Sequence, residues 1–154
     1  MTSARTEILQ RVRAAKGAMP PISARTYHRA GELTGAALVD LFVQRVLDYK
    51  ATVYRCSPAD AGATIESALA EVNATRTVVP TGLPVHLRPL GCEADPGGHG
   101  RELERFEAVV TTAHLAIADT GTFVLDHPDP SQGRRALSLV PDTHPCVLSV
   151  DQTV

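Results

Sequence analysis

The chain has 154 residues, a formal net charge of −2 at pH 7 and no Trp. This length favours one domain with its own core, and the small charge gives no basis for a nucleic-acid surface. No apolar run is long enough to span a membrane, and the N-terminus lacks a signal-peptide core. Cys56, Cys92 and Cys146 lie far apart without a C-x-x-C pair, which argues against a disulfide framework or a self-contained iron–sulfur site. We therefore expect a reduced, cytoplasmic protein.

The N-terminal segment predicts a short helix followed by a linker. Residues 3–16 place their apolar side chains on one helical face, and Gly17 then stops the helix. Residues 20–34 show little periodicity. We assign residues 1–34 to an N-terminal helix and linker and residues 35–154 to the main domain. A lone helix of this length is marginal in water, so we expect its apolar stripe to dock on the main domain or on another subunit.

Helices and strands alternate through the middle of the chain. Ser57 and Pro58 are a strong helix start, as N-cap and first helical residue. The expected elements are a helix at 36–50, a strand at 52–56, a helix at 57–73 and strands at 77–80, 85–87, 107–111 and 146–150. The alternation of the first four is typical of parallel βαβ units. The sequence therefore predicts an α/β fold.

Residues 116–125 predict a strand, a tight polar turn and a second strand. The turn is Asp119-Thr120-Gly121-Thr122, in which Gly121 is suited to a positive φ. Its backbone N–H groups and the two hydroxyls suit a phosphate or a carboxylate, and its carboxylate suits acid–base work or a sugar hydroxyl. The same residues are also ordinary hairpin chemistry. Both interpretations stay open on spacing alone.

Two segments resemble the signatures of a known family. Residues 109–122, Val-Val-Thr-Thr-Ala-His-Leu-Ala-Ile-Ala-Asp-Thr-Gly-Thr, resemble the signature of the LUD domain family, the family of the lactate utilisation protein C. Residues 134–144, Arg-Arg-Ala-Leu-Ser-Leu-Val-Pro-Asp-Thr-His, resemble its second signature, with an Arg, a Leu-Ser-Leu run, a Pro and a His. The resemblance covers most of the chain and is most specific between residues 109 and 150.

The resemblance implies both a fold and a pathway. The fold is a three-layer α/β/α arrangement with a mostly parallel sheet, like that of the ribose-phosphate isomerase and CoA-transferase superfamily. The pathway is the oxidation of lactate to pyruvate, in which this domain is the subunit without clusters beside two partners that carry iron–sulfur clusters. We therefore expect no cofactor in this chain and clusters on its partners. Whether the chain is itself catalytic stays open.

The sequence departs from the family pattern in two places. The turn carries Asp119 where many relatives have Glu, a side chain with longer reach. The chain also stops at Val154, whereas relatives continue with a Gly-Pro-Ser stretch and a nearby Thr/Asp/Glu cluster. We expect part of the family's site to lie in that further segment, whether it is absent from the protein or only from this sequence.

The expected ligand is a small anion bound at the turn by Asp119, Thr120, Gly121 and Thr122. Arg134 is the best cation to lie opposite, because its fork binds carboxylates bidentately and lactate is a carboxylate. The alternative for this arginine is a solvated side chain at the start of a strand. Two other functions stay open: a free-standing enzyme of the isomerase or CoA-transferase type, and a structural scaffold subunit.

Three histidines, His114, His127 and His144, flank the two signatures. Three imidazoles are enough for a catalytic metal site. These three lack a metal-type spacing such as H-x-x-x-H, so surface or loop-bracing roles are the default. We predict no metal site.

Overall fold

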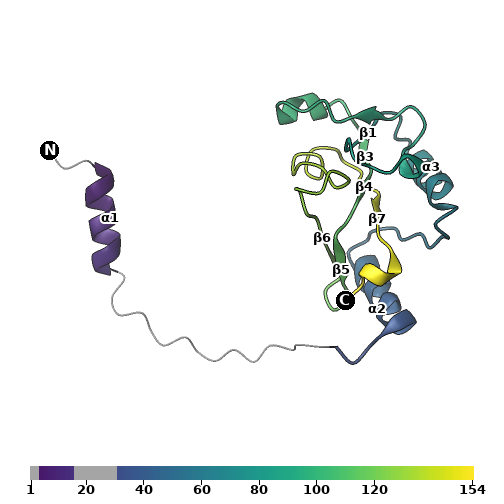
Figure 1. Ribbon diagram of the computed structural model, residues 1–154, viewed down its shortest axis with the longest axis horizontal. Helices are drawn as coiled ribbons and strands as arrows, with labels where there is room; N and C mark the ends of the chain where they lie inside the picture. Colours follow the sequence, from purple (N-terminus) through teal and green to yellow (C-terminus); the bar gives the residue numbers. More distant parts are fainter. Residues whose placement is uncertain (1–3, 16–30) are drawn as a thin grey trace. The chain divides into compact units, whose positions relative to one another are not determined.

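The computed structural model describes residues 4–15 and 31–154. The chain divides into two units, 1–32 and 33–154, which are described separately. In the first, α1 (Ala4–Ala15) confirms the predicted N-terminal helix, while its predicted stop and most of the linker lie outside the described residues. Everything below concerns the second unit (Figure 1). No helix in the described part of the chain is both long and apolar enough to cross a membrane.

The second unit is built on parallel strand pairs. The strand β1 (Thr77–Val79) lies between β2 (Glu93–Ala94) and β3 (Ala108–Val109), and both pairings are parallel. All three residues of β1 are buried, as expected for a strand covered on both faces. The prediction of an α/β fold with a mostly parallel sheet is confirmed. The three-layer arrangement and the superfamily relationship stay predictions.

A single extended segment runs through the middle of this unit. It begins with β3 and continues as β4 (Thr111–Thr112) and β5 (Leu115–Ile117). On one side β4 pairs in parallel with β7 (Cys146–Val147), and β5 pairs antiparallel with β6 (Thr122–Val124). The C-terminal segment follows this strand in parallel, with further bridges that join Ala108 to Thr143 and Ala116 to Thr153.

Two further helices and two buried clusters complete the unit. The helices are α2 (Gly35–Asp48) and α3 (Ala61–Glu71), close to the predicted ranges. In α3, Ala61, Ile65 and Leu69 are buried, and they pack with β1 and with residues of the loop that follows it. A second cluster contains Val78, Leu103, Phe106, Val109 and Leu137. The apolar periodicity that predicted α3 is thus explained by its packing.

Some predicted elements are wrong. Residues 51–57 form no strand; the segment pairs with no neighbouring strand, and the side chains of Tyr54 and Arg55 bond those of Glu71 and Asp40. The segment Val85–Leu87 is a short 3₁₀ turn, since prolines on either side of it leave few N–H groups for a ladder.

The starts and ends of two elements also differ from prediction. Helix α3 begins at Ala61 rather than after Ser57, whose hydroxyl donates instead to Asp60 Oδ2 at 2.6 Å. The final strand β7 is two residues long, and the chain then leaves the sheet for a 3₁₀ turn, η3 (Val150–Gln152). This departure from the sheet opens the pocket described below.

Candidate functional site

The Asp-Thr-Gly-Thr turn joins β5 to β6, as the sequence predicts. Gly121 has a φ of +65°, the left-handed conformation that glycine adopts most readily. Thr120 Oγ1 donates to Thr122 Oγ1 at 2.9 Å, and the Asp119 side chain is exposed. The strand–turn–strand prediction is confirmed. Anion binding at the turn stays a prediction.

The turn lies against the C-terminal half of α2. A Cβ atom built on Gly121 would approach Arg45 Cβ to 2.8 Å and the Val46 backbone nitrogen to 3.0 Å. These distances are too short for a real side chain, and two of the three nearest atoms belong to helix backbone. Glycine is therefore required here by packing as well as by its φ angle.

Arg134 lies in a different environment from the predicted one. Its guanidinium holds Asp95 bidentately, with Nε–Oδ2 at 2.8 Å and Nη2–Oδ1 at 3.0 Å. It also donates to the carbonyls of Gly97 and Gly98, so all but one of its N–H groups are used. The hydrogen bonds between the two side chains, with their opposite charges as a smaller cause, lower the pKa of Asp95 and raise that of Arg134. These bonds brace the loop after β2, and none of them reaches the Asp119–Thr122 turn.

Replacing Asp95 with asparagine is expected to cost about 1–3 kcal/mol at neutral pH, because a half-buried guanidinium loses its charged partner. The pKa of Asp95 is lowered from its ordinary value of 3.8, mainly by its hydrogen bond from Arg134. With a folded pKa below the unfolded one, the stabilisation is present above pH 3.8 and is lost as the pH falls through the folded pKa. Urea denaturation across this pH range should show that Asp95→Asn loses less free energy of unfolding on acidification than the wild type does.

The matched control for this prediction is Asp48→Asn, at an exposed carboxylate without an ion-pair partner among the described residues. It should follow wild type at both ends of the pH range. An Asp95→Asn variant that loses as much stability as wild type on acidification would contradict the role given to the ion pair.

The three histidines lie in separate environments. His144 Nε2 lies 2.8 Å from Thr111 Oγ1 and its ring meets Phe123 edge-on, while burial lowers its pKa. His127 Nδ1 lies 2.9 Å from the Gly133 carbonyl oxygen. His114 instead lines a pocket. In the described ranges, no group of three His, Cys, Asp or Glu side chains is arranged to hold a metal ion.

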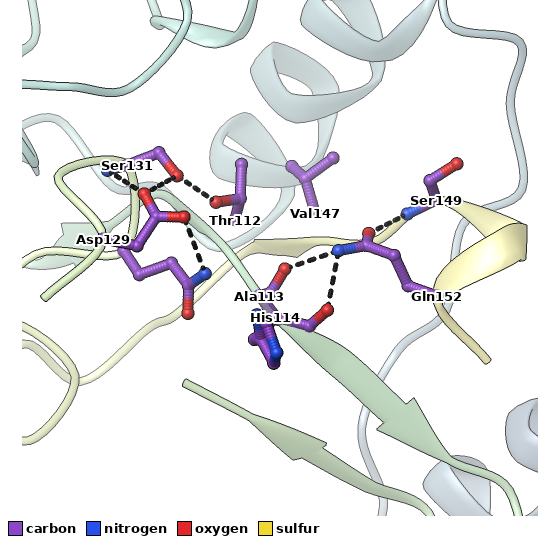
Figure 2. A pocket seen from close by; sticks show the side chains of 9 residues that line it. Thr112, Ala113, His114, Asp129, Ser131, Val147, Ser149 and Gln152 are labelled. Carbon is purple, nitrogen blue, oxygen red and sulfur yellow. Dashed lines mark hydrogen bonds between the residues drawn. The ribbon is translucent and has the colours of Figure 1, made fainter. Parts of the chain in front are cut away.

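A pocket of about 340 Å³ opens where the parallel strands β4 and β7 end (Figure 2). It is lined by the last residue of each strand, by the residues that follow them and by the loop after β6: Thr112, Ala113, His114, Asp129, Ser131, Gln132, Val147, Ser149 and Gln152. Ligands of α/β proteins characteristically bind beyond the carboxyl ends of parallel strands. This pocket has that position.

One hydrogen-bonded group in the pocket is centred on Asp129. Its Oδ1 accepts from the Ser131 backbone N–H at 2.8 Å and from the Ser131 hydroxyl at 2.7 Å. The Ser131 hydroxyl also bonds Thr112 Oγ1 at 2.7 Å, and the almost fully buried Gln132 donates to Asp129 Oδ2 at 3.3 Å. The hydrogen bonds from Ser131 are the main cause that lowers the pKa of Asp129. Asp129 is therefore an ionised acceptor at neutral pH.

The second group is centred on Gln152, which bridges the gap where the C-terminal segment leaves the sheet. Its Nε2 donates to the carbonyls of Ala113 at 2.8 Å and His114 at 3.0 Å. Its Oε1 accepts from the Ser149 N–H at 2.7 Å. The side chain thus replaces the ladder between the Ala113–Val147 and Ala116–Val154 bonds. Gln152 therefore supplies hydrogen bonds to the strand's backbone carbonyls at the point where the pocket opens.

Sequence reasoning named only one residue of this pocket, His114, as a candidate. For Asp129 and Ser131 a local pattern exists, because an Asp two residues before a Ser is typical of a turn in which the carboxylate accepts the second residue's N–H. That pattern was the available signal. No local sequence pattern identifies Gln152, because its hydrogen-bond partners lie 38 and 39 residues earlier in the chain.

Two comparisons with known proteins point to the same family. No protein-family model matches the chain. A protein of Deinococcus radiodurans called lactate utilization protein C is 38% identical over 154 residues, a match that covers 98% of this chain and 71% of that protein. The crystal structure of a DUF162 family protein from the same organism matches with a TM-score of 0.73 and 42% identity, over 79% of this chain and 74% of that one.

Proposed function

This chain belongs to the LUD (DUF162) family of the lactate utilisation protein C, and from this premise we propose a role in lactate utilisation. In this role it is the subunit without clusters in a system that oxidises lactate to pyruvate, and its partners carry the iron–sulfur clusters. The observation that carries the proposal is the 38% identity with lactate utilization protein C over 98% of the chain.

The chemistry of the cysteines supports this division of labour. Iron–sulfur clusters are held by several thiolates gathered at one point. Cys56, Cys92 and Cys146 are free and belong to no metal-binding group among the described residues. Electron transfer through clusters is accordingly assigned to partner subunits.

The proposal retains a small anionic ligand at the Asp119–Thr122 turn, as expected from the sequence. It is supported by the exposed Asp119 carboxylate and by the left-handed conformation of Gly121 in a tight polar turn. Arg134 is not counted toward this site, because most of its N–H groups bind Asp95 and the neighbouring carbonyls.

Co-purification tests the assignment of partners. A tagged full-length chain, expressed at its natural level in cells growing on lactate, should capture proteins that carry iron–sulfur clusters, recognised by their absorbance and iron content. An untagged strain controls for non-specific binding. Repeated capture without any cluster-bearing protein would contradict the proposed place in a multi-subunit system.

A further inference from the structure

The pocket at the ends of β4 and β7 carries a negative charge without a cationic partner. Asp129 is ionised, and no Lys or Arg is among the residues that line the pocket. None of the ion pairs in the described ranges, 4–15 and 31–154, involves this carboxylate. The other titratable side chain of the lining, that of His114, is exposed to solvent. The electrostatics of the pocket therefore favour a cation over an anion or a neutral group.

The hydroxyl hydrogens next to this carboxylate are already used inside the protein. Because Asp129 is ionised, the single hydrogen of the Ser131 hydroxyl is donated to Oδ1 at 2.7 Å. In the 2.7 Å bond between the two hydroxyls, Thr112 must then be the donor. Thr112, Ser131 and Asp129 thus form a chain in which both hydroxyl hydrogens point toward the carboxylate. Their side chains can accept hydrogen bonds from a ligand but have no hydroxyl hydrogen left to donate.

Three acceptor atoms of this chain remain available. Thr112 Oγ1 donates to Ser131 and accepts from no residue in the described part of the protein. Asp129 Oδ2 has one long bond, of 3.3 Å, from Gln132 Nε2, and Ser131 Oγ keeps one lone pair. The Thr112 hydroxyl and the Asp129 carboxylate lie close together at one end of the pocket (Figure 2). A ligand group that binds between them has to be a hydrogen-bond donor.

An apolar side chain lies next to these acceptors. Val147 is the residue that pairs with Thr112 in the parallel ladder of β4 and β7, and both residues line the pocket. Figure 2 shows their side chains next to each other. A ligand whose donor group meets Thr112 therefore finds an apolar contact for its carbon atoms at Val147.

We propose that this end of the pocket binds the ammonium group of a small primary amine, which donates to Asp129 and Thr112 while its carbon chain contacts Val147. An ammonium group combines a positive charge with three N–H donors and has no acceptor, so it matches one negative charge and three acceptors. A divalent metal ion fits less well, because no group of three His, Cys, Asp or Glu side chains in the described residues is arranged to hold one. A volume of about 340 Å³ is sufficient for a small organic molecule. An amine site here is independent of the role in lactate utilisation.

Three probes with the same number of carbon atoms test the preference for a cation. They are propylamine, 1-propanol and propionate, which are respectively cationic, neutral and anionic at neutral pH. Titration of the isotope-labelled full-length chain at constant ionic strength, followed by the NMR signals of the backbone amides of Thr112, His114 and Ser131, measures each affinity. Propylamine should bind at least about fivefold more tightly than 1-propanol, because its hydrogen bond to the carboxylate is assisted by charge. Propionate should give no displacement of these signals.

Two variants locate the site, and a third is the matched control. Asp129→Asn keeps the size of the side chain and should weaken propylamine binding by about fivefold or more and remove the preference over 1-propanol. Thr112→Val removes an acceptor without changing a residue of the loop that holds Asp129, and should also weaken propylamine binding. Asp126→Asn removes an equal charge from an exposed position in the same loop, outside the pocket lining, and should bind as wild type does. Circular dichroism and melting curves confirm that each variant is folded.

Several results would overturn the amine site. Propylamine that displaces none of these amide signals, or that binds no more tightly than 1-propanol, would contradict it directly. Potassium chloride that displaces the same signals at the same concentrations would show binding of cations without recognition of an amine. Unchanged affinity in both pocket variants, or an equal loss in Asp126→Asn, would show that Asp129 and Thr112 do not hold the ligand. A chain that is required for growth on lactate but fails this titration loses the amine site and keeps its role in the pathway.

Discussion

Substituting Gly121 with alanine is expected to lower the free energy of unfolding by about 2–5 kcal/mol. Two costs add. The left-handed φ of +65° costs an L-residue about 1–2 kcal/mol. The new methyl group would also meet Arg45 and Val46 of α2 at 2.8–3.0 Å, and overpacking of this kind costs about 1–3 kcal/mol. Urea denaturation of the purified variant measures the sum.

Gly91 offers a matched control for this substitution. It has a similar φ of +75°, but a Cβ atom there would have nothing within 4 Å. Gly91→Ala should therefore show the conformational cost alone, about 1–2 kcal/mol. Equal losses for the two variants would mean that the turn does not pack on α2 as described. The comparison also separates the structural role of the Asp-Thr-Gly-Thr turn from any role in binding.

Substituting Leu137 with alanine is expected to cost about 2–5 kcal/mol. Leu137 is fully buried in the cluster that contains Val78, Leu103, Phe106 and Val109. Removing its isobutyl group loses the transfer free energy of the buried carbons and leaves a cavity that the cluster fills only in part. Chemical denaturation gives the loss directly, and ligand binding by the folded fraction should be unchanged.

Leu139 is the control in the same segment. It is two residues away in the Leu-Ser-Leu run, but its side chain is 66% exposed. Leu139→Ala should change stability by less than about 0.5 kcal/mol. If the two leucines proved equally costly to replace, the placement of this run in the structure would be wrong. The pair shows that part of the second signature serves the core.

Local patterns predicted much of the fold. The apolar periodicity of α2 and α3 and the buried run of β1 identified an α/β chain, and the Asp-Thr-Gly-Thr sequence identified the hairpin of β5 and β6. These features depend on residues close together in the chain. The strand expected at 52–56 failed because β-propensity alone does not form a strand where no neighbouring strand pairs with the segment.

The candidate pocket was not predictable to the same extent, because long-range contacts build it. Its walls come from the ends of β4 and β7 and from the loop after β6, and the gap between them depends on Gln152 replacing a strand ladder. Arg134 shows the same limit. Its suitability for binding a carboxylate was recognised from sequence, but the carboxylate it holds is that of Asp95, 39 residues earlier.

Growth on lactate tests the proposed function most directly. A strain that lacks this gene should fail to grow, or grow much more slowly, on L-lactate as sole carbon source, while its growth on pyruvate is unchanged. The wild-type gene supplied in trans should restore growth on lactate. Normal growth of the deletion strain on L-lactate, with no second copy of the gene present, would contradict a role in lactate utilisation.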